Sequence, residues 1–226
     1  YMLRNDGERF VPWTDDPLVA YEHLHRYLFA SSLVEGKKVL DLASGEGYGS
    51  DLLAEKACEV LGVDINDQAV KHASEKYQRQ NLRFVHGQIT AVPVEGNHVF
   101  DVITCFEAIE HIDQHDLLMK EVKRLLKPDG FLVMSTPNKR ESSDPAHTKD
   151  PYHVKELYEE EFVALVSAHF RRAAFFGQKV LPASNIFRMP SRSDPVSGRF
   201  IKRKGQGFEC ARPDDRKAQY SITVAS

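Results

Sequence analysis

Short apolar runs alternate with amphipathic stretches along most of this chain, from Gly36 onward. Five of the apolar runs are candidates for buried strands: 38–42, 59–64, 82–86, 99–105 and 131–136. Four stretches with apolar residues at helical spacing follow them: about 48–57, 67–79, 113–126 and 155–169. This alternation predicts an α/β fold in which helices flank a mostly parallel sheet.

Two later runs extend the predicted sheet, at 172–180 and at 219–225. The last run alternates polar and apolar residues, which is typical of a half-exposed or antiparallel edge strand. Just before the strand at 131–136, Lys127-Pro-Asp-Gly130 predicts a turn, because proline fixes φ and glycine supplies a positive φ. Asn66 and Asp113 are the expected N-caps of the helices that follow them.

Two segments lie outside this alternation. Residues 1–35 precede the first strand and contain a predicted helix from about Pro17 to Leu33, so we expect an N-terminal helical segment ahead of a main domain at 36–226. Residues 180–213 are an expected insertion with two acidic residues and seven basic ones: Arg188, Arg192, Arg199, Lys202, Arg203, Lys204 and Arg212. This excess of basic residues indicates either a face that meets an anionic acceptor or a solvated loop.

The composition excludes several classes of protein. The chain has 226 residues, of which 42% are apolar and 28% charged, the balance of a globular domain. A net charge of −3 argues against nucleic-acid binding. No apolar run approaches the roughly 20 residues that span a bilayer, so we expect no transmembrane segment.

Cysteine usage indicates the compartment. Cys58, Cys105 and Cys210 are far apart and form no CxxC pair, so neither a disulfide framework nor a zinc site is expected. We therefore expect a cytoplasmic protein without a metal, and the sequence leaves its oligomeric state open. Because the chain begins at Tyr1 rather than at a methionine, we also expect one domain of a longer protein.

A glycine-rich segment joins the first strand to the first helix. In Asp41-Leu-Ala-Ser-Gly-Glu-Gly-Tyr-Gly49, three glycines would let a cofactor approach the backbone closely. Their spacing, GxGxG, differs from the GxGxxG pattern that places a pyrophosphate at a helix N-terminus. The segment begins with the acid Asp41, which suits a cofactor with cationic amino and sulfonium groups. Asp64 ends the second strand, where a carboxylate can accept hydrogen bonds from both ribose hydroxyls.

Four segments, in chain order, resemble the motifs of class I S-adenosylmethionine-dependent methyltransferases. Residues 39–50 resemble motif I and 62–66 the second motif, while 100–112 resemble the fourth-strand motif and 125–131 the turn before strand five. The resemblance covers about 36–170, with a departure at Ala43, where the family commonly has glycine. It implies a Rossmann-like mixed seven-stranded sheet, mostly parallel with an antiparallel last strand and helices on both faces.

The resemblance also implies which residues bind S-adenosyl-L-methionine. Four would surround its methionine part: Asp41, Ala43, Gly45 and Gly47. Five would serve the nucleoside and the transferred methyl group: Asp64 at the ribose, Ile65, Gln88 and Ile89 at the adenine, and Phe106 at the methyl-transfer site. Simple core packing is the alternative for Ile65 and Phe106.

The N-terminal helix is a lid over the cofactor in this family. That role would bring Tyr21 and Arg26 to the cofactor, with Arg26 pairing with the methionine carboxylate. A surface arginine is the alternative interpretation.

His111 is the candidate general base. It follows the carboxyl end of the fourth strand, where sheets of this kind bind ligands. An alcohol or phenol must lose its proton during methylation, and histidine is suited to remove it near neutral pH. We expect Glu107 or Glu110 to orient His111. His153 is a second candidate, although a loop histidine is more often solvated or a cap.

The acceptor is indicated by a more particular resemblance. Segments 7–12, 21–27, 106–111, 135–138 and 152–156 resemble methyltransferase domains associated with bacterial surface-polysaccharide and glycosyltransferase proteins. This resemblance implies O-methylation of a sugar hydroxyl in glycan biosynthesis. A small aromatic or quinone-like acceptor, a nicotinamide-dependent oxidoreductase and a non-catalytic cofactor-binding or docking module are the alternatives.

Overall fold

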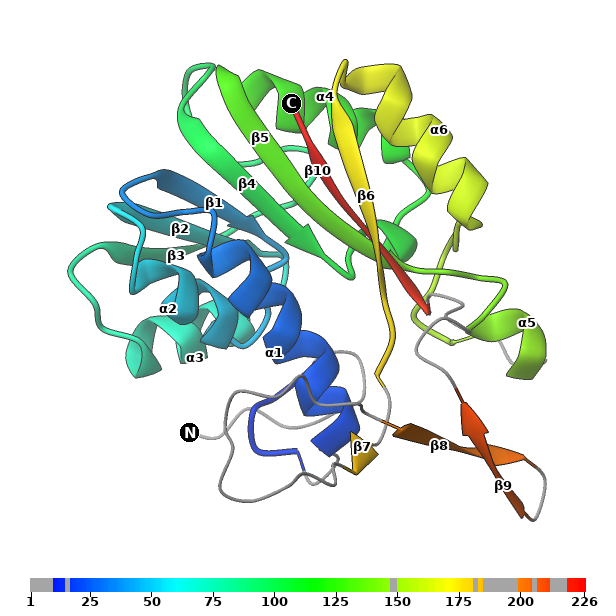
Figure 1. Cartoon of the computed structure of the whole chain (residues 1–226). Helices are drawn as coiled ribbons and strands as arrows, with labels where there is room; N and C mark the ends of the chain where they lie inside the picture. The colour runs from blue at the N-terminus through cyan, green and yellow to red at the C-terminus, as the bar shows by residue number, and fades with distance from the viewer. Residues whose placement is uncertain are drawn as a thin grey trace, which may run out of the picture.

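The computed structural model describes residues 10–14, 17–146, 150–180, 183–184, 199–204, 207–211 and 219–226. Within these ranges a seven-stranded sheet forms the centre of the molecule (Figure 1). Its strands, in spatial order, are β3 (Leu82–His86), β2 (Glu59–Asp64), β1 (Lys38–Leu42), β4 (Phe100–Phe106), β5 (Leu126–Pro137), β10 (Tyr220–Ala225) and β6 (Ala173–Gln178). The first five strands in this order pair in parallel and β10 is antiparallel to both neighbours, which confirms the predicted fold class.

Strand β10 is not the edge strand that its alternating sequence predicted. It pairs with β5 on one side and with β6 on the other, so that Ile222 lies opposite both Ser135 and Phe176. Its polar residues Ser221 and Thr223 are therefore buried together with the apolar ones. The edge is β6, where Phe176 is largely exposed. Alternation alone cannot separate an exposed face from a buried one that accepts small hydroxyl side chains.

Helices cover both faces of the sheet because successive strand residues point in opposite directions. Val39, Val102 and Val133 pack with α1 (Pro17–Ser31) and α2 (Tyr48–Ala54). Their neighbours Leu40 and Ile103 point to the other face and pack with α4 (His115–Leu125) and α6 (Glu159–His169). In Figure 1, α3 (Asp67–Lys76) lies beside α2, and α4 lies beside α6.

Helix ends agree with the sequence at one cap and differ at another. Asn66 caps α3, because its side-chain oxygen accepts hydrogen bonds at 3.0 Å from the backbone of Gln68 and Ala69. Asp113 was wrongly expected to cap α4, whose N-cap is Gln114. The short 3₁₀ turn η1 (Ile109–His111) precedes that helix.

The segment Lys127-Pro-Asp-Gly130 is part of β5 rather than the predicted turn. The pairing of β4 with β5 shifts register between Phe100 and Val102, so the extra residues of β5 are accommodated in a bulge. Gly130 does not have a positive φ. A Cβ there would lie 2.8 Å from the carbonyl oxygen of Asp101, so the glycine permits a close backbone approach instead.

The insertion contains regular structure that the sequence did not predict. Strands β7 (Ala183–Ser184), β8 (Arg199–Lys204) and β9 (Gly207–Ala211) form a second, antiparallel sheet, which lies away from the central one in Figure 1. Arg188, Arg192 and Arg212 lie outside the described residues, as do the side chains of the other basic residues of the insertion. Among the described helices, none has the length and apolar character needed to cross a bilayer.

Candidate active site

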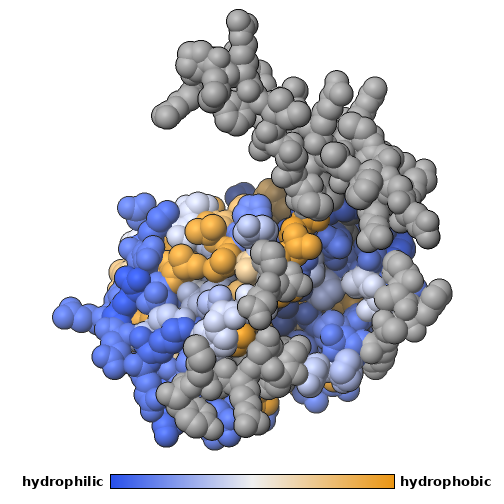
Figure 2. All heavy atoms as spheres, turned by 90° about the horizontal axis from the view of Figure 1, so that it is seen from below, coloured by the Kyte–Doolittle hydropathy of each residue, from blue (hydrophilic) through white to orange (hydrophobic). Residues whose placement is uncertain are grey.

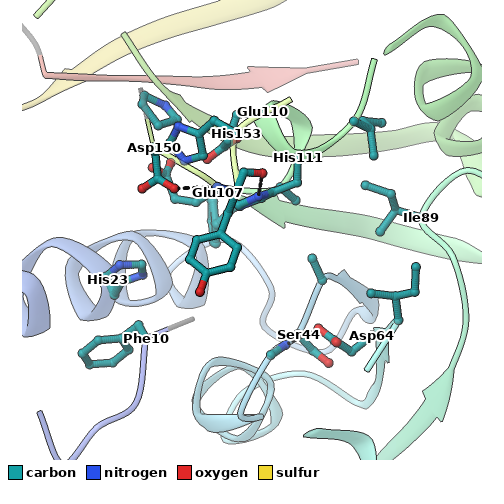
Figure 3. Close-up of a pocket in the computed structure, with 18 of the residues that line it drawn as sticks. Phe10, His23, Ser44, Asp64, Ile89, Glu107, Glu110, His111, Asp150 and His153 are labelled. Atoms are coloured by element: carbon teal, nitrogen blue, oxygen red, sulfur yellow. Dashed lines mark hydrogen bonds between the residues drawn. The ribbon is translucent and has the colours of Figure 1, made fainter. Parts of the chain in front are cut away.

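A cavity of about 1410 Å³ opens at the carboxyl ends of β1, β2 and β4, beside residues 10–14 and α1. In Figure 3, Ser44, Asp64 and Ile89 lie at one end of this cavity, and Glu110, His111 and His153 lie at the other. The surface view from this side of the molecule, Figure 2, shows apolar and hydrophilic patches next to each other. We call the first the glycine end and the second the histidine end.

The glycine-rich segment makes a tight turn at the glycine end. Ala43, Gly45 and Gly47 all have positive φ, at 56°, 56° and 96°. A Cβ at Gly47 would lie 2.7 Å from the Cβ of Ala73 in α3, so this glycine is required by packing. At Gly45 a Cβ would meet nothing within 4 Å, and the residue lines the cavity. Its backbone is therefore open to a ligand.

Asp64 joins this turn to the end of β2. Its carboxylate accepts hydrogen bonds from the backbone N–H of Gly45 at 2.8 Å and from that of Asn66 at 2.9 Å. The residue is almost buried but lines the cavity. Each carboxylate oxygen has a second lone pair. The site therefore fits a ligand with two adjacent hydroxyls, as the ribose of S-adenosylmethionine has.

Asp41 lies outside the cavity lining, although we expected it beside the methionine part of the cofactor. Its buried carboxylate accepts hydrogen bonds from Ser50 at 2.6 Å, from Thr104 at 2.7 Å and from Tyr27 at 3.2 and 3.3 Å. Burial raises its pKa to about 6, although the hydrogen bonds from these three hydroxyls oppose the rise. Asp41 thus links β1 to α2, β4 and α1 from within the protein.

Five of the other expected cofactor residues line the cavity: Ala43, Ile65, Gln88, Ile89 and Phe106. The side chain of Ile65 is 65% exposed, which excludes the alternative of core packing for this residue. Phe106 is largely buried and makes an edge-to-face contact with Tyr27, with 5.0 Å between ring centroids. Tyr21 is also exposed but is not among the lining residues, and neither is Gly47.

Arg26 is buried behind the cavity instead of lining it or lying on the surface. Its Nε donates to the side chain of Gln178 at 2.8 Å, and its guanidinium lies 4.4 Å from the ring centroid of Tyr220. One terminal nitrogen is 3.6 Å from a carboxylate oxygen of Glu107. Neither terminal nitrogen has a hydrogen-bond partner among the described residues. This position disfavours the expected pairing of Arg26 with a cofactor carboxylate.

The histidine end gathers residues from two segments. His111 donates from Nδ1 to the backbone carbonyl of Tyr152 at 3.0 Å, and its ring makes an edge-to-face contact with the ring of His153. The orienting partner of His111 is therefore this carbonyl, rather than Glu107 or Glu110 as expected. His153 donates from Nδ1 to the carboxylate of Glu156. Both histidines line the cavity.

The two acids near His111 have different surroundings. Glu107 has a positive φ of 48° and accepts a hydrogen bond from Ser135 at 2.6 Å. A positive φ at a residue other than glycine costs free energy and is concentrated at functional sites. Glu110 is fully buried, and its pKa is raised by burial and then by the negative charge of Glu107. Its backbone carbonyl accepts from the N–H groups of Val154 and Lys155, which holds the His153 loop in place.

Some other lining residues were assigned no site role from the sequence. Phe10 stacks on His23 of α1, with 4.7 Å between ring centroids. Burial, aided by the positive charge of Arg26, lowers the pKa of His23 to about 3, so its imidazole is neutral. Glu46, in the glycine-rich turn, binds Lys76 and Tyr77 at 2.8 and 2.7 Å. These contacts depend on chain segments far apart in sequence, which periodicity does not reveal.

Comparisons with known proteins agree with this geometry. Residues 40–134 match the family model of a methyltransferase domain. A Mycolicibacterium smegmatis protein named as an S-adenosylmethionine-dependent methyltransferase is 34% identical over 169 residues, which are 71% of this chain and 62% of that protein. The chain contains a methyltransferase domain of the class I S-adenosylmethionine-dependent family. S-adenosylmethionine is the cofactor of this family, and the turn at Gly45 together with Asp64 fits its nucleoside.

Further relatives of this chain include enzymes named for ubiquinone biosynthesis. The ubiquinone biosynthesis O-methyltransferase of Actinobacillus pleuropneumoniae is 40% identical over 114 residues, 46% of this chain and 47% of that protein. The chain spans less than two thirds of the length of these curated relatives. Among solved structures, an Archaeoglobus fulgidus methyltransferase has a TM-score of 0.63 at 17% identity. The aligned region covers 93% of this chain and 95% of that chain. That likeness shows the fold.

Proposed function

We propose that this methyltransferase transfers the methyl group of S-adenosylmethionine to a hydroxyl group of a sugar in bacterial glycan biosynthesis. The observation that carries the proposal is the polar histidine end of the cavity, where Glu107, Glu110, His111, Asp150 and His153 all line the wall. Carboxylates and imidazoles bind the several hydroxyls of a sugar well, because each can accept a hydrogen bond from one of them.

For the transfer itself, the protein mainly has to align the acceptor oxygen with the methyl carbon. The acceptor oxygen forms a bond to the methyl carbon while the sulfur–carbon bond breaks and its electron pair returns to sulfur, leaving a neutral thioether. The reaction requires that the two reactants be held in line and that water be excluded. The acceptor hydroxyl must also lose its proton. We assign this step to His111. The carbonyl of Tyr152 can only accept a hydrogen bond, so the proton of the neutral ring is on Nδ1 and Nε2 has a lone pair.

The experiment is a methylation screen with S-adenosylmethionine that carries a deuterated methyl group. Sugars, nucleotide-linked sugars and glycan termini are incubated with the protein, and the products are analysed by mass spectrometry. We expect the labelled methyl group to be found on a sugar hydroxyl. Label on an amine, or no labelled sugar although an aromatic acceptor is methylated, would contradict it.

A second candidate is methylation of a small aromatic or quinone-like hydroxyl. The similarity to the ubiquinone biosynthesis O-methyltransferases favours it. So do the aromatic side chains of Phe10, Phe106 and Tyr152, which line the same cavity. A catechol and a quinol in the same screen separate the two candidates directly, since both candidates require the same cofactor end. If no acceptor is methylated although S-adenosylmethionine binds, a non-catalytic cofactor-binding module becomes the better interpretation.

A further inference from the structure

Three side chains at the histidine end converge on one point of the cavity wall. Glu110, His111 and His153 each offer one ligand atom, and these atoms lie within 4.8 Å of one another. All three residues line the cavity. In Figure 3 the two imidazoles and the Glu110 carboxylate lie together, on the side away from Asp64. Two imidazoles and one carboxylate are a common ligand set for divalent transition-metal ions.

The hydrogen bonds around this cluster prepare both rings for metal binding. The carbonyl of Tyr152 holds the proton of His111 on Nδ1, and the carboxylate of Glu156 accepts from Nδ1 of His153. Each ring therefore has Nε2 available as a ligand atom. Partners of this kind orient metal-binding histidines and raise their basicity. Glu156 is itself held by a hydrogen bond of 2.6 Å from Ser143.

The three residues are also held relative to one another. Val154 and Lys155, which follow His153, donate from their backbone N–H groups to the carbonyl of Glu110 at 2.8 and 3.0 Å. The carboxylates of Glu107 and of the buried Glu110 both line this end of the cavity. Carboxylates attract a cation most strongly where they are shielded from water.

We propose that Glu110, His111 and His153 bind a divalent first-row transition-metal ion, such as Mn²⁺, Co²⁺ or Zn²⁺, whose open positions receive the acceptor hydroxyl. The imidazole ligands favour these ions over Mg²⁺ and Ca²⁺, which prefer oxygen ligands. No metal was expected from the positions of the cysteines, and this site contains no cysteine.

This inference rests on the proposed function and changes one step of it. The ion lowers the pKa of a bound hydroxyl, so the hydroxyl proton is released to solvent and His111 uses its lone pair as a ligand rather than as a base. The atoms balance as before, because the acceptor oxygen replaces its proton with the methyl group and the sulfonium becomes a thioether. Two adjacent hydroxyls, as many sugars carry, could occupy two open positions.

The test is a titration of the chelator-treated protein with Co²⁺, followed by visible absorption. We expect one equivalent to bind and to give d–d bands. His153→Ala and Glu110→Gln should each weaken Co²⁺ binding by at least about tenfold. His169→Ala is the matched control. His169 is the last residue of α6, pairs with Asp116 of α4 and does not line the cavity. The affinity of this variant should equal that of the wild type.

Calorimetry with S-adenosylhomocysteine verifies that each variant is folded, and assays with and without chelator complete the test. Absence of stoichiometric Co²⁺ binding, or equal affinity in wild type and His153→Ala, would overturn the metal proposal. Methylation that persists in the presence of chelator would overturn it as well and leave the proposed function intact. Co²⁺ binding that depends on His153, in a protein that methylates no acceptor, would instead support the metal site and count against the proposed function.

Discussion

The carboxylate of Asp64 accepts a hydrogen bond from the backbone N–H of Gly45 at 2.8 Å, and both residues line the same cavity. The end of β2 thus fixes the turn that follows β1. Because the two strands are parallel neighbours in the sheet, their carboxyl ends meet at this point. Because of this contact, the glycine-rich segment together with Asp64 predicts a cofactor site better than the glycine-rich segment does alone.

Replacing Asp64 should weaken cofactor binding without unfolding the protein. Asp64→Ala removes a charged acceptor, and each hydrogen bond to a charged group contributes roughly 1.5 to 3 kcal/mol. We therefore expect the dissociation constant for S-adenosylhomocysteine, measured by calorimetry, to rise roughly 10- to 100-fold. Asp67→Ala is the control, since that side chain is 83% exposed. An unchanged constant for Asp64→Ala would refute the ribose assignment.

Loss of His111 should impair turnover and spare the cofactor. As a general base, the role in the proposed function, His111 would contribute about 10²- to 10⁴-fold, so His111→Ala should lower kcat by a factor in this range. If His111 is a metal ligand, its loss should lower kcat as well. The affinity for S-adenosylhomocysteine should stay within about twofold of the wild-type value, because His111 lies at the end of the cavity away from Asp64. Steady-state kinetics with any acceptor found in the screen measures the effect. Full activity would remove His111 from the reaction.

Asp41 should make stability depend on pH in a defined window. Its pKa is raised by burial to about 6 in the folded protein, from about 3.9 in an unfolded chain. The folded state therefore holds the proton more tightly, and ionisation of Asp41 lowers stability as the pH rises from about 4 to 6, by about 3 kcal/mol. The penalty is then constant above that window.

Urea unfolding of the wild type and of Asp41→Asn between pH 4 and pH 7.5 measures this effect. The variant cannot ionise, so the free energy of unfolding of the wild type relative to the variant should fall through the window and then level off. A difference that stays the same at every pH would show that Asp41 does not titrate there.

Ala43 occupies a backbone conformation that favours glycine, with φ of 56°. The left-handed conformation costs a residue other than glycine about 1 to 2 kcal/mol, while glycine loses about 0.4 to 1 kcal/mol more entropy on folding. Ala43→Gly should thus raise the free energy of unfolding by up to about 1 kcal/mol. Ala69→Gly, in α3, should lower it by about 1 kcal/mol. A destabilised Ala43→Gly would mean that the methyl group of Ala43 contributes packing that outweighs the backbone cost.

The Arg26–Glu107 pair should be energetically coupled. Removing one partner of a buried ion pair typically costs about 3 to 5 kcal/mol, because the other charge stays buried. Arg26→Met should therefore destabilise the protein strongly in the wild-type background and by less in a Glu107→Gln background. Chemical unfolding of the two single variants and the double variant gives the coupling. Additive effects would mean that the 3.6 Å contact contributes no free energy.

The sequence predicted the features that depend on local pattern. Asn66 caps its helix as expected, and the strands that carry Asp41, Asp64 and Phe106 lie where their apolar runs indicated. Features that depend on tertiary contacts were not accessible. The insertion of β10 between β5 and β6 is set by the return of the chain across the sheet, which its alternation does not encode.

The same distinction applies to the candidate site, where some features follow from local pattern and others depend on tertiary contacts. Asp64 and Gly45 follow from strand order, whereas the burial of Asp41 and Arg26 depends on how α1 packs against the sheet. The partner of His111 is a backbone carbonyl at Tyr152, 41 positions along the chain, and a carbonyl leaves no trace in the sequence. The convergence of His153 on Glu110 likewise appears only once the loop is folded.

Binding calorimetry with S-adenosylmethionine, S-adenosylhomocysteine and NADH tests the central claim, that the cavity between Gly45 and His111 binds the sulfonium cofactor. We expect one molecule of S-adenosylmethionine or of S-adenosylhomocysteine to bind per chain, and we expect NADH to give no binding heat. Tight binding of NADH, with no heat from either sulfur compound, would contradict it.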